Sequence, residues 1–507
     1  MKSTPLAVLL LVAGLAAGAA PVKVDVSWDK VKGPWKTTAT LQVVVNPPLR
    51  PGSPIHDRAF AELKRLGADY VRYVPWLPYP RLGVAELEPP TKEKTSWDFT
   101  LIDPTTLAFL NATQGHSVML NFSTIPAWMF QTPQPVPYPD NPDEPVWNYT
   151  QGTEPRDPSL KEIGNYFARV VGWYVNGGFT DELGKRHESG HHFKVDYWEV
   201  LNEPDFEHQT TPQQYTARYD AVVGAVRKVS PGTKFVGISV AIPGNTPDMF
   251  EYFLNHKNHK PGIPLDMISY HFYATPAADE SEASQQHTFF TQADGFLNTA
   301  RYIESMRKRL SPETRTTINE TGCIAADDMD QGLPGHVVKA IPESYWNLCG
   351  ATYAYVFGNL AEMGIDVVGE SQLLGYPTQF PSVSMLDWNT GAPNARFRIL
   401  ELLKGSFLAG GKIVVTNSPS PFVYTLATIQ ATGERKLLLV NKRDRDVDIT
   451  LPRRASRVEY VDQTTKADPP ASQAVTGDAL TLHGYSVAVV TMASEQPIES
   501  TQSSPTR

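Results

Sequence analysis

The segments WEVLNEP at residues 198–204 and TTINETG at residues 316–322 decide the fold of this chain. Each is a strand-like apolar run that reaches an Asn-Glu pair, and a turn follows each glutamate. Parallel strands that end on one face of a barrel can direct their carboxylates to a common point. The two segments therefore predict two strand ends that carry carboxyl groups with different chemical roles.

On both sides of these segments, between about residues 40 and 405, β-rich runs alternate with amphipathic helical windows. This alternation is typical of the α/β class with a parallel sheet. The expected strands are eight, the number that a closed (β/α)8 barrel requires, at residues 41–46, 70–74, 117–122, 196–201, 234–240, 267–272, 316–319 and 365–369. Residues 40–405 are thus predicted to form a catalytic barrel.

The pattern changes after residue 405. Short β-type runs separated by turns continue to residue 492, which predicts an antiparallel β-sandwich over residues 406–492. An alternating segment at residues 22–28 is expected to add a strand to it. Residues 493–507 are rich in Ser, Thr, Gln and Pro, and we expect a disordered tail.

The N-terminus has the order of a secretory signal peptide: Lys2, an apolar run at residues 6–15, and small residues to Ala20. We therefore predict a signal peptide at residues 1–20 and a secreted protein, extracellular or periplasmic. The apolar run is too short to span a bilayer, and no later stretch could do so, so no membrane partner is expected.

The amino-acid composition of the chain limits the kinds of partner that it is expected to bind. The 507 residues carry a formal net charge of −9 and no block of basic residues, which argues against nucleic acid as a partner. Cys323 and Cys349 are the only cysteines, and both a single bridge and two free thiols remain open. The sequence does not determine the oligomeric state.

No cofactor or metal is expected. The chain has no phosphate-binding glycine loop and no Gly-x-Ser-x-Gly motif. His187, His191 and His192 could suggest zinc, but they precede the strand at 196–201 and so lie at the opposite end from the carboxylates.

Glycosidic bonds are cleaved with retention by two carboxyl groups, one acting as acid/base and one as nucleophile. We assign Glu203 as the acid/base and Glu320 as the nucleophile, with Asn202 in reach of the sugar 2-hydroxyl. Glu370, at the end of the eighth expected strand, is the reserve candidate for the nucleophile. Asp205 and Glu199 are the nearest competitors of Glu203; Glu199 alternates away from the catalytic end and is expected in a buried ion pair.

The chain resembles clan A retaining glycoside hydrolases, and most closely family 39, which contains β-xylosidases and α-L-iduronidases. The residues that carry the resemblance are Asn202-Glu203-Pro204, Glu320, His271, Tyr273, Arg72 and the runs at 385–388 and 394–397. By this resemblance, His271 and Tyr273 contact the nucleophile and Arg72 lies under the catalytic centre. Tyr73-Val74-Pro75 and Leu201 depart from the family pattern, which leaves the sugar open.

Aromatic residues near strand ends are candidates for stacking on a sugar face, namely Trp76, Trp128, Trp388 and Tyr273. Long loops at residues 75–92 and 126–157 are expected to shape a substrate cleft. An acidic sugar would need a basic residue in that cleft, with Arg50, Arg81 and Lys92 as candidates.

The leading hypothesis is a secreted, cofactor-free glycosidase that degrades oligo- or polysaccharides through a covalent glycosyl-enzyme intermediate. A transglycosylase on the same site and a catalytically inactive carbohydrate-binding barrel are the alternatives. The sandwich could be a carbohydrate-binding module, although its continuity with the last barrel helix favours a structural role.

Overall fold

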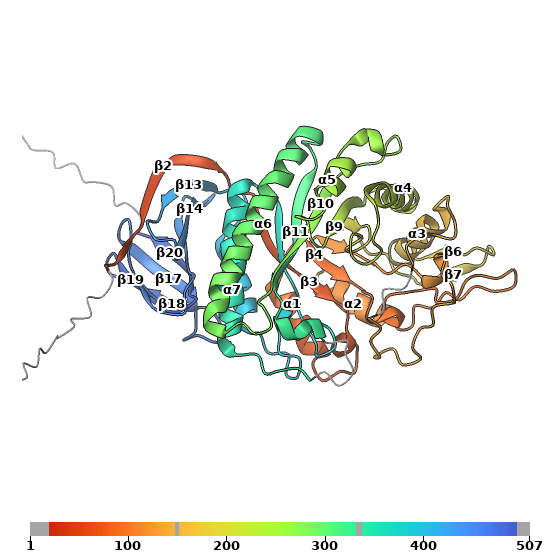
Figure 1. Cartoon of the computed structure of the whole chain (residues 1–507), viewed down its shortest axis with the longest axis horizontal. Helices are drawn as coiled ribbons and strands as arrows, with labels where there is room; N and C mark the ends of the chain where they lie inside the picture. Colours follow the sequence, from red (N-terminus) through yellow and green to blue (C-terminus); the bar gives the residue numbers. More distant parts are fainter. Residues whose placement is uncertain (1–19, 148–151, 331–336, 494–507) are drawn as a thin grey trace, which may run out of the picture.

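The computed structural model describes residues 20–147, 152–330 and 337–493. Its centre is a closed barrel of eight parallel strands, as the alternation predicted (Figure 1). In order around the barrel these are β3 (Thr38–Val44), β4 (Val71–Val74), β5 (Val118–Leu120), β8 (Tyr197–Glu199), β9 (Lys234–Val240), β10 (Met267–Ala274), β11 (Arg315–Cys323) and β12 (Val367–Glu370). All eight expected strands are present, so the (β/α)8 prediction is confirmed.

Helices surround the barrel and bury their apolar faces on it. They are α1 (His56–Leu66), α2 (Asp103–Ala112), α3 (Lys161–Val175), α4 (Pro212–Val229), α5 (Pro247–Phe253), α6 (Glu282–Leu310), α7 (Glu343–Met363) and α8 (Ala395–Ser406). In α1 the helical spacing places Phe60, Leu63 and Leu66 in the core. The sequence did not predict α2 or α5, because α2 lacks a clear apolar stripe and α5 has only seven residues.

The C-terminal residues form two facing sheets around a second apolar core, which confirms the sandwich. The larger sheet contains β2 (Asp25–Pro34), β13 (Lys412–Asn417), β14 (Val423–Ile429), β15 (Arg435–Asn441), β17 (Ala455–Val461), β18 (Ala471–Ala474) and β20 (Val487–Met492). The smaller contains β1 (Val22–Lys23), β16 (Val447–Thr450) and β19 (Ala479–Leu482). The strand β18 was not expected because its Ala, Ser and Gln residues show no alternation.

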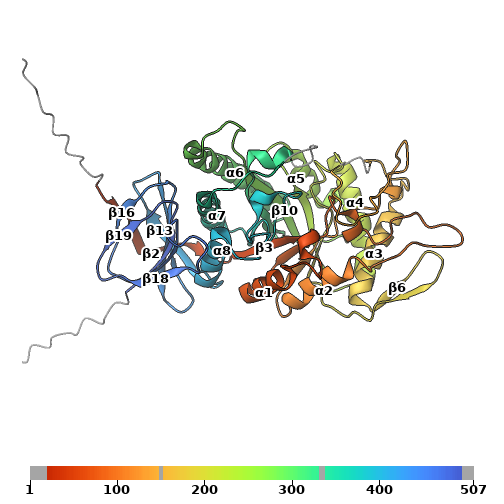
Figure 2. The same cartoon turned by 90° about the horizontal axis from the view of Figure 1, so that it is seen from below.

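The N-terminal strands belong to the sandwich although the barrel follows them in sequence. Figure 1 shows β2, in red, beside the blue strands, and β2 pairs antiparallel with β13. The chain thus enters the barrel from the sandwich and returns to it through α8. Near that junction Gly358 of α7 lies against Tyr424 of β14, where an added Cβ would come within 2.6 Å of the tyrosine ring. Figure 2 shows α7 and α8 between the sandwich and the rest of the barrel.

Further expectations from the sequence concern the two termini, membrane-spanning helices and the cysteines. The predicted signal peptide, apart from Ala20, and the predicted tail from residue 494 onward lie outside the described residues. Among the helices of the described segments, none is long and apolar enough to cross a membrane. Cys323 and Cys349 are both buried and free.

A two-stranded hairpin of β6 (Gly178–Thr180) and β7 (Arg186–Glu188) precedes β8.

A buried ion pair joins the last barrel strand to the last barrel helix. Arg396 of α8 donates from Nε to Glu370 of β12 across 2.9 Å, and neither side chain is exposed. Burial raises the pKa of Glu370 to about 7, although Arg396 opposes the shift. Glu370, the reserve nucleophile of the sequence analysis, therefore has a structural partner on the outer side of the barrel.

We predict that Arg396→Met destabilises the protein by about 3–5 kcal/mol, because it leaves a buried carboxylate without its partner. The midpoint of urea unfolding measures the effect. The control is Lys94→Met, which breaks the exposed Lys94–Glu88 pair and should change stability by less than about 1 kcal/mol. Equal effects of the two substitutions would show that the buried pair has no special role.

Candidate active site

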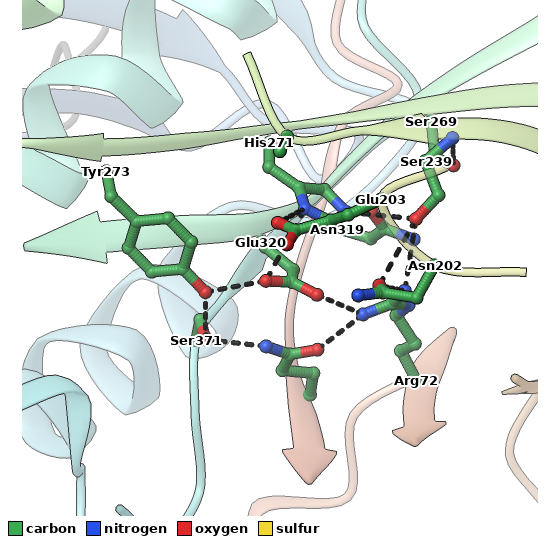
Figure 3. Close-up of polar contacts among 12 residues, drawn as sticks. Arg72, Asn202, Glu203, Ser239, Ser269, His271, Tyr273, Asn319, Glu320 and Ser371 are labelled. Carbon is green, nitrogen blue, oxygen red and sulfur yellow. Dashed lines mark hydrogen bonds and ion pairs between the residues drawn. The ribbon is translucent and has the colours of Figure 1, made fainter. Parts of the chain in front are cut away.

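A cavity of about 740 Å³ opens at the C-terminal ends of the barrel strands. Glu203, Glu320, Asn202, His271 and Tyr273 all line it, as does Trp76. Figure 3 shows Glu203 and Glu320 directed toward the same point, with His271 between them. The structure thus brings together most of the side chains that the sequence indicated.

Glu203 follows β8 on a turn of unusual backbone geometry. Leu201 has φ 65° and Glu203 has φ 40°, both in the left-handed region that non-glycine residues rarely adopt. On the neighbouring strand β9, Ile238 and Ser239 also have positive φ. The Glu203 amide donates to the carbonyl of Ser239 across 3.0 Å, so the two strained strand ends support each other. Such strain is concentrated at functional sites, where it fixes a side chain in place.

The sequence placed Glu320 at the very end of a strand, whereas the structure places it inside one. The strand β11 continues past it to Cys323, and its pairing with β10 and with β12 shifts register at this point. The register places three steps of β11, from Thr317 to Glu320, opposite two steps of β10, from Ser269 to His271. This bulge lets adjacent Asn319 and Glu320 both point into the barrel, which a regular strand would forbid.

Arg72 of β4 lies under both catalytic candidates and is only 1% exposed. Its guanidinium donates to Glu320 and Glu199 through short contacts, and to Gln42 and Asn202 at 2.6 Å each. Glu199 also accepts from Asn121, Ser269 and Asn319. Glu199 therefore sits in the buried ion pair that the sequence predicted.

His271 bridges the two carboxyl groups. Its Nδ1 lies 2.8 Å from Glu203 Oε1 and 3.5 Å from Glu320 Oε2, while Nε2 lies 3.1 Å from the Ser239 hydroxyl. Burial opposes charging of the ring, but Glu320 and Glu203 outweigh it and raise the pKa of His271. Its imidazolium can therefore donate from both ring nitrogens.

Glu203, His271 and Glu320 also form the one grouping of potential metal ligands in the described residues, with ligand atoms within 4.8 Å of one another. Arg72 donates to Glu320, and Tyr273 donates to it across 2.7 Å. Both donors occupy the oxygens that a cation would need, and Arg72 adds a repelling charge. This donor set suits a free carboxylate nucleophile better than a metal ligand.

The two glutamates have opposite pKa shifts. Burial raises the pKa of Glu203, and the charge of Glu320 adds to the effect although His271 opposes it. Burial also acts on Glu320, yet His271 and Arg72 outweigh it and lower the pKa of Glu320. Glu203 therefore keeps its proton to higher pH than Glu320 does, which is the order that acid and nucleophile roles require.

Tyr273 completes the surroundings of Glu320. Its hydroxyl also lies 2.6 Å from Ser371 Oγ. Burial, together with the charge of Glu320, raises the pKa of Tyr273 well above its usual value, so the hydroxyl keeps its proton. It therefore remains a hydrogen-bond donor to the nucleophile at any working pH.

A third buried carboxyl group, Glu207, was not found by the sequence analysis. Its Oε1 accepts from Asn202 Nδ2 at 2.7 Å and from Trp76 Nε1 at 2.5 Å. Burial and the nearby Glu203 raise the pKa of Glu207 well above its usual value, which favours its neutral form. It lies four residues after Glu203 in an irregular loop, where no periodicity could have indicated an inward orientation.

Two predicted sugar-stacking residues need correction. Trp128 does not line the cavity; its ring packs under Arg156 and its indole nitrogen donates to the carbonyl of Glu86. Trp388 packs partly buried against the barrel core and does not line the cavity either. Both follow strand ends in sequence, but the intervening loops turn them toward the protein interior.

The remaining candidates lie elsewhere. Asp205 accepts from the amides of Ala241 and Ile242 at 3.0 and 3.2 Å, which makes it a loop anchor. His187 pairs with Asp181, and His191 lies 3.4 Å from Asp103, so these histidines do not gather into a zinc site.

The candidate basic residues for an acidic sugar do not line the cavity either. Arg50 pairs with Asp143, and Arg81 bonds to the carbonyl of Pro139. Lys92 is exposed on a surface loop.

Two models of known families match parts of the chain. Residues 180–316 match the model of glycosyl hydrolases family 39, a range that includes Glu203 and His271 and ends shortly before Glu320. Residues 422–490 match the C-terminal immunoglobulin-like domain of D-apionate lactonase. No match is found among curated proteins.

Solved structures share the architecture at low sequence identity. A GH51 arabinofuranosidase from Xanthomonas axonopodis pv. citri aligns with TM-score 0.62 and 12% identity, over 93% of this chain and all of that chain. A glucosidase from Croceicoccus marinus aligns with TM-score 0.58 and 16% identity, and a GH30 endoxylanase from Clostridium papyrosolvens C71 with 0.58 and 15%, each over 94% of this chain and 100% of the other. At these identities the structural likeness establishes the fold alone, and the family match carries the activity. The protein is accordingly a glycosidase, similar over residues 180–316 to glycosyl hydrolases family 39.

Proposed function

We propose that this protein is an exported retaining glycosidase in which Glu203 is the acid/base and Glu320 the nucleophile. The observation that carries the proposal is the pair itself: carboxyl oxygens within 4.8 Å of each other, bridged by His271, with opposite pKa shifts. Retaining enzymes keep their carboxyl groups about 5–5.5 Å apart, whereas inverting ones need about 6.5–9.5 Å to fit a water. Export is inferred from the signal-like sequence at residues 1–20.

In the first step, an ionised Glu320 oxygen attacks the anomeric carbon while Glu203 gives its proton to the departing glycosidic oxygen. The C–O bond to the leaving group breaks and a glycosyl ester to Glu320 forms. In the second step, Glu203, now ionised, takes a proton from water, and the resulting hydroxide displaces Glu320. Two inversions leave the anomeric configuration unchanged.

Neighbouring residues supply orientation and electrostatic stabilisation. Arg72 and Tyr273 hold the Glu320 carboxylate by donating to its two oxygens. Asn202 is fixed by accepting from Arg72 and donating to Glu207, so its amide is positioned for the sugar 2-hydroxyl. A hydrogen bond there strengthens as the oxocarbenium ion develops.

The sugar that this cavity accepts is proposed to be neutral. Within the described part of the chain, no lysine or arginine lines the cavity, and the buried Arg72 below it is engaged by its own partners. A uronic acid would place its carboxylate in this cavity without a cation to compensate the lost hydration.

The proposal predicts activity on a panel of 4-nitrophenyl glycosides and of plant and microbial oligosaccharides. Glu320→Ala should lose about 1,000-fold or more in kcat, because the covalent step lacks its nucleophile. Glu203→Ala should lose about 100- to 10,000-fold on substrates with poor leaving groups. Azide should rescue Glu320→Ala and give a glycosyl azide of inverted configuration, observed by NMR.

The exposed Glu88 provides the matched control, since Glu88→Ala should retain parent activity. Full activity of Glu320→Ala would refute its role as nucleophile. Cleavage with inversion by the parent would refute the retaining mechanism. Glycan binding without any cleavage would favour the inactive barrel, and transfer of the sugar to added acceptors in preference to water would favour the transglycosylase.

A second prediction concerns pH. Activity needs Glu320 ionised and Glu203 protonated, so kcat/KM should rise with pH through the pKa of Glu320, then fall through that of Glu203. Tyr273→Phe removes a hydrogen bond that lowers the pKa of Glu320, so the acidic limb should move to higher pH while the basic limb stays. We expect kcat at the optimum to fall about 10- to 100-fold. Tyr302→Phe, at an exposed tyrosine of α6, is the control; an unmoved acidic limb in Tyr273→Phe would contradict the assignment.

A third prediction tests the neutral state of Glu207. Glu207→Gln keeps an acceptor oxygen for Asn202 and Trp76, so its kcat should fall less than about fivefold. Glu207→Leu removes that oxygen and should lower kcat by about 100-fold, since Asn202 loses its orientation. If both variants lose activity equally in steady-state assays, the charge of Glu207 matters and its assignment as a neutral positioning group fails.

A further inference from the structure

The acid/base Glu203 identifies which wall of the cavity meets the leaving group. The proton that Glu203 donates goes to the oxygen of the departing alcohol, so that alcohol must lie against the residues around Glu203. These residues come from the loops after β8 and β9, from β10 and from α6, and all of these segments line the cavity. Asp205 ties the two loops together through its bonds to the amides of Ala241 and Ile242.

This acid-side wall is apolar. It consists of Phe206, Ala241, Ile242, Pro243, Phe272 and Phe296. Phe206 and Ile242 are each 52% exposed, among the most exposed large hydrophobic side chains of the described residues. Deeper in the wall, Phe272 of β10 and Phe296 of α6 stack with ring centroids 4.6 Å apart. Exposed apolar side chains gathered at a cleft mark a surface that a ligand covers.

Two polar side chains of the same wall, Gln292 and Thr299, are already bonded to neighbouring backbone groups. Gln292 donates from Nε2 to the carbonyl of Thr275 and accepts on Oε1 from its amide, both at 2.8 Å. The Thr299 hydroxyl donates to the carbonyl of Gly295. A sugar in this position would lose water from several hydroxyl groups and find few partners to replace it.

The opposite wall has a different character. Trp76 and Phe380 stack there with centroids 6.3 Å apart, and Gln42, Gln372 and Asn202 line the same end. The two stacked rings suit the apolar face of a pyranose. The amides of Gln42, Asn202 and Gln372 are bonded to neighbouring groups, so the rings distinguish this wall. The glycone therefore fits this second wall, and the acid-side wall is left for the leaving group.

We propose that the natural substrates are glycosides of apolar alcohols or phenols, with the aglycone bound by Phe206, Ile242, Phe272 and Phe296. This inference rests on the proposed function, and it replaces a second sugar as the expected leaving group. The bond cleaved and the proton transfers are those of the two-step retaining mechanism, so the products are a free sugar and an apolar alcohol.

The test compares methyl, 2-phenylethyl and disaccharide substrates that share the glycone and anomeric configuration found active in the 4-nitrophenyl panel. Methyl and 2-phenylethyl glycosides both release alkanols, so their ratio reports binding of the aglycone more than leaving-group acidity. We expect kcat/KM for the 2-phenylethyl glycoside to exceed both others by about 10- to 100-fold, from burial of the phenyl ring.

The double variant Phe206→Ser, Ile242→Ser should lower the preference of 2-phenylethyl over methyl glycoside at least about fivefold. Tyr302→Ser, an exposed aromatic outside the cavity, should leave the ratio unaltered. Preference for the disaccharide, equal rates on all three substrates, or a ratio insensitive to the double variant would each overturn the proposal.

A binding measurement separates this inference from the catalytic proposal. Saturation-transfer NMR with 2-phenylethanol should detect binding to the parent and reduced binding to the double variant, whether or not any glycoside is cleaved. Binding without hydrolysis of any glycoside would support the apolar subsite while refuting the catalytic proposal. Hydrolysis of a glycoside without binding of 2-phenylethanol would support the catalytic proposal and refute the apolar subsite.

Discussion

The buried guanidinium of Arg72 is the interaction on which the catalytic end of the barrel depends. A guanidinium has five N–H donors, and here each has an acceptor: Glu199, Gln42, Glu320, Asn202 and Ser239. The acceptors come from strands around the barrel, so one side chain fixes the register of several strand ends. Removal of a buried charge from water is costly, and only this complete set of partners makes it tolerable.

This arrangement explains why the pKa shifts of Glu203 and Glu320 differ in direction although both glutamates lie in the same cavity. Arg72 and His271 stand next to Glu320 and stabilise its charge, whereas Glu203 faces His271 and the negative field of Glu320. The pKa of Glu203 is raised mainly by burial, whereas at Glu320 the charges of His271 and Arg72 together outweigh burial and lower the pKa. The strained backbone at Leu201, Glu203, Ile238 and Ser239 is the conformational cost of holding this geometry.

The sequence alone predicted the architecture and included Glu203 and Glu320 among its candidates. Strands and helices repeat their apolar residues at regular spacing, and each Asn-Glu pair stands at the end of a strand-like run. Eight apolar runs alternated with helices, and Asn202-Glu203 stood at the end of one of them. The bulge at Asn319 and Glu320 left no such signal, since it depends on how β10 and β11 pair in space. Glu207 was missed, and Trp128 and Trp388 were misplaced, for a related reason: loop conformation decides their direction, and loops carry no repeat.

The contrast between the two walls also affects the second chemical step, in which the glycosyl ester is resolved. After an apolar alcohol leaves, the described residues of the acid-side wall present mainly apolar side chains, and the Gln292 amide is already bonded to the backbone of Thr275. A sugar acceptor would meet the same unfavourable surface that the leaving group avoided, whereas water needs only the Glu203 carboxylate as a partner. If the acid-side wall binds the leaving group as proposed, it also favours hydrolysis over transfer to another sugar, because it withholds interactions from the competing acceptor.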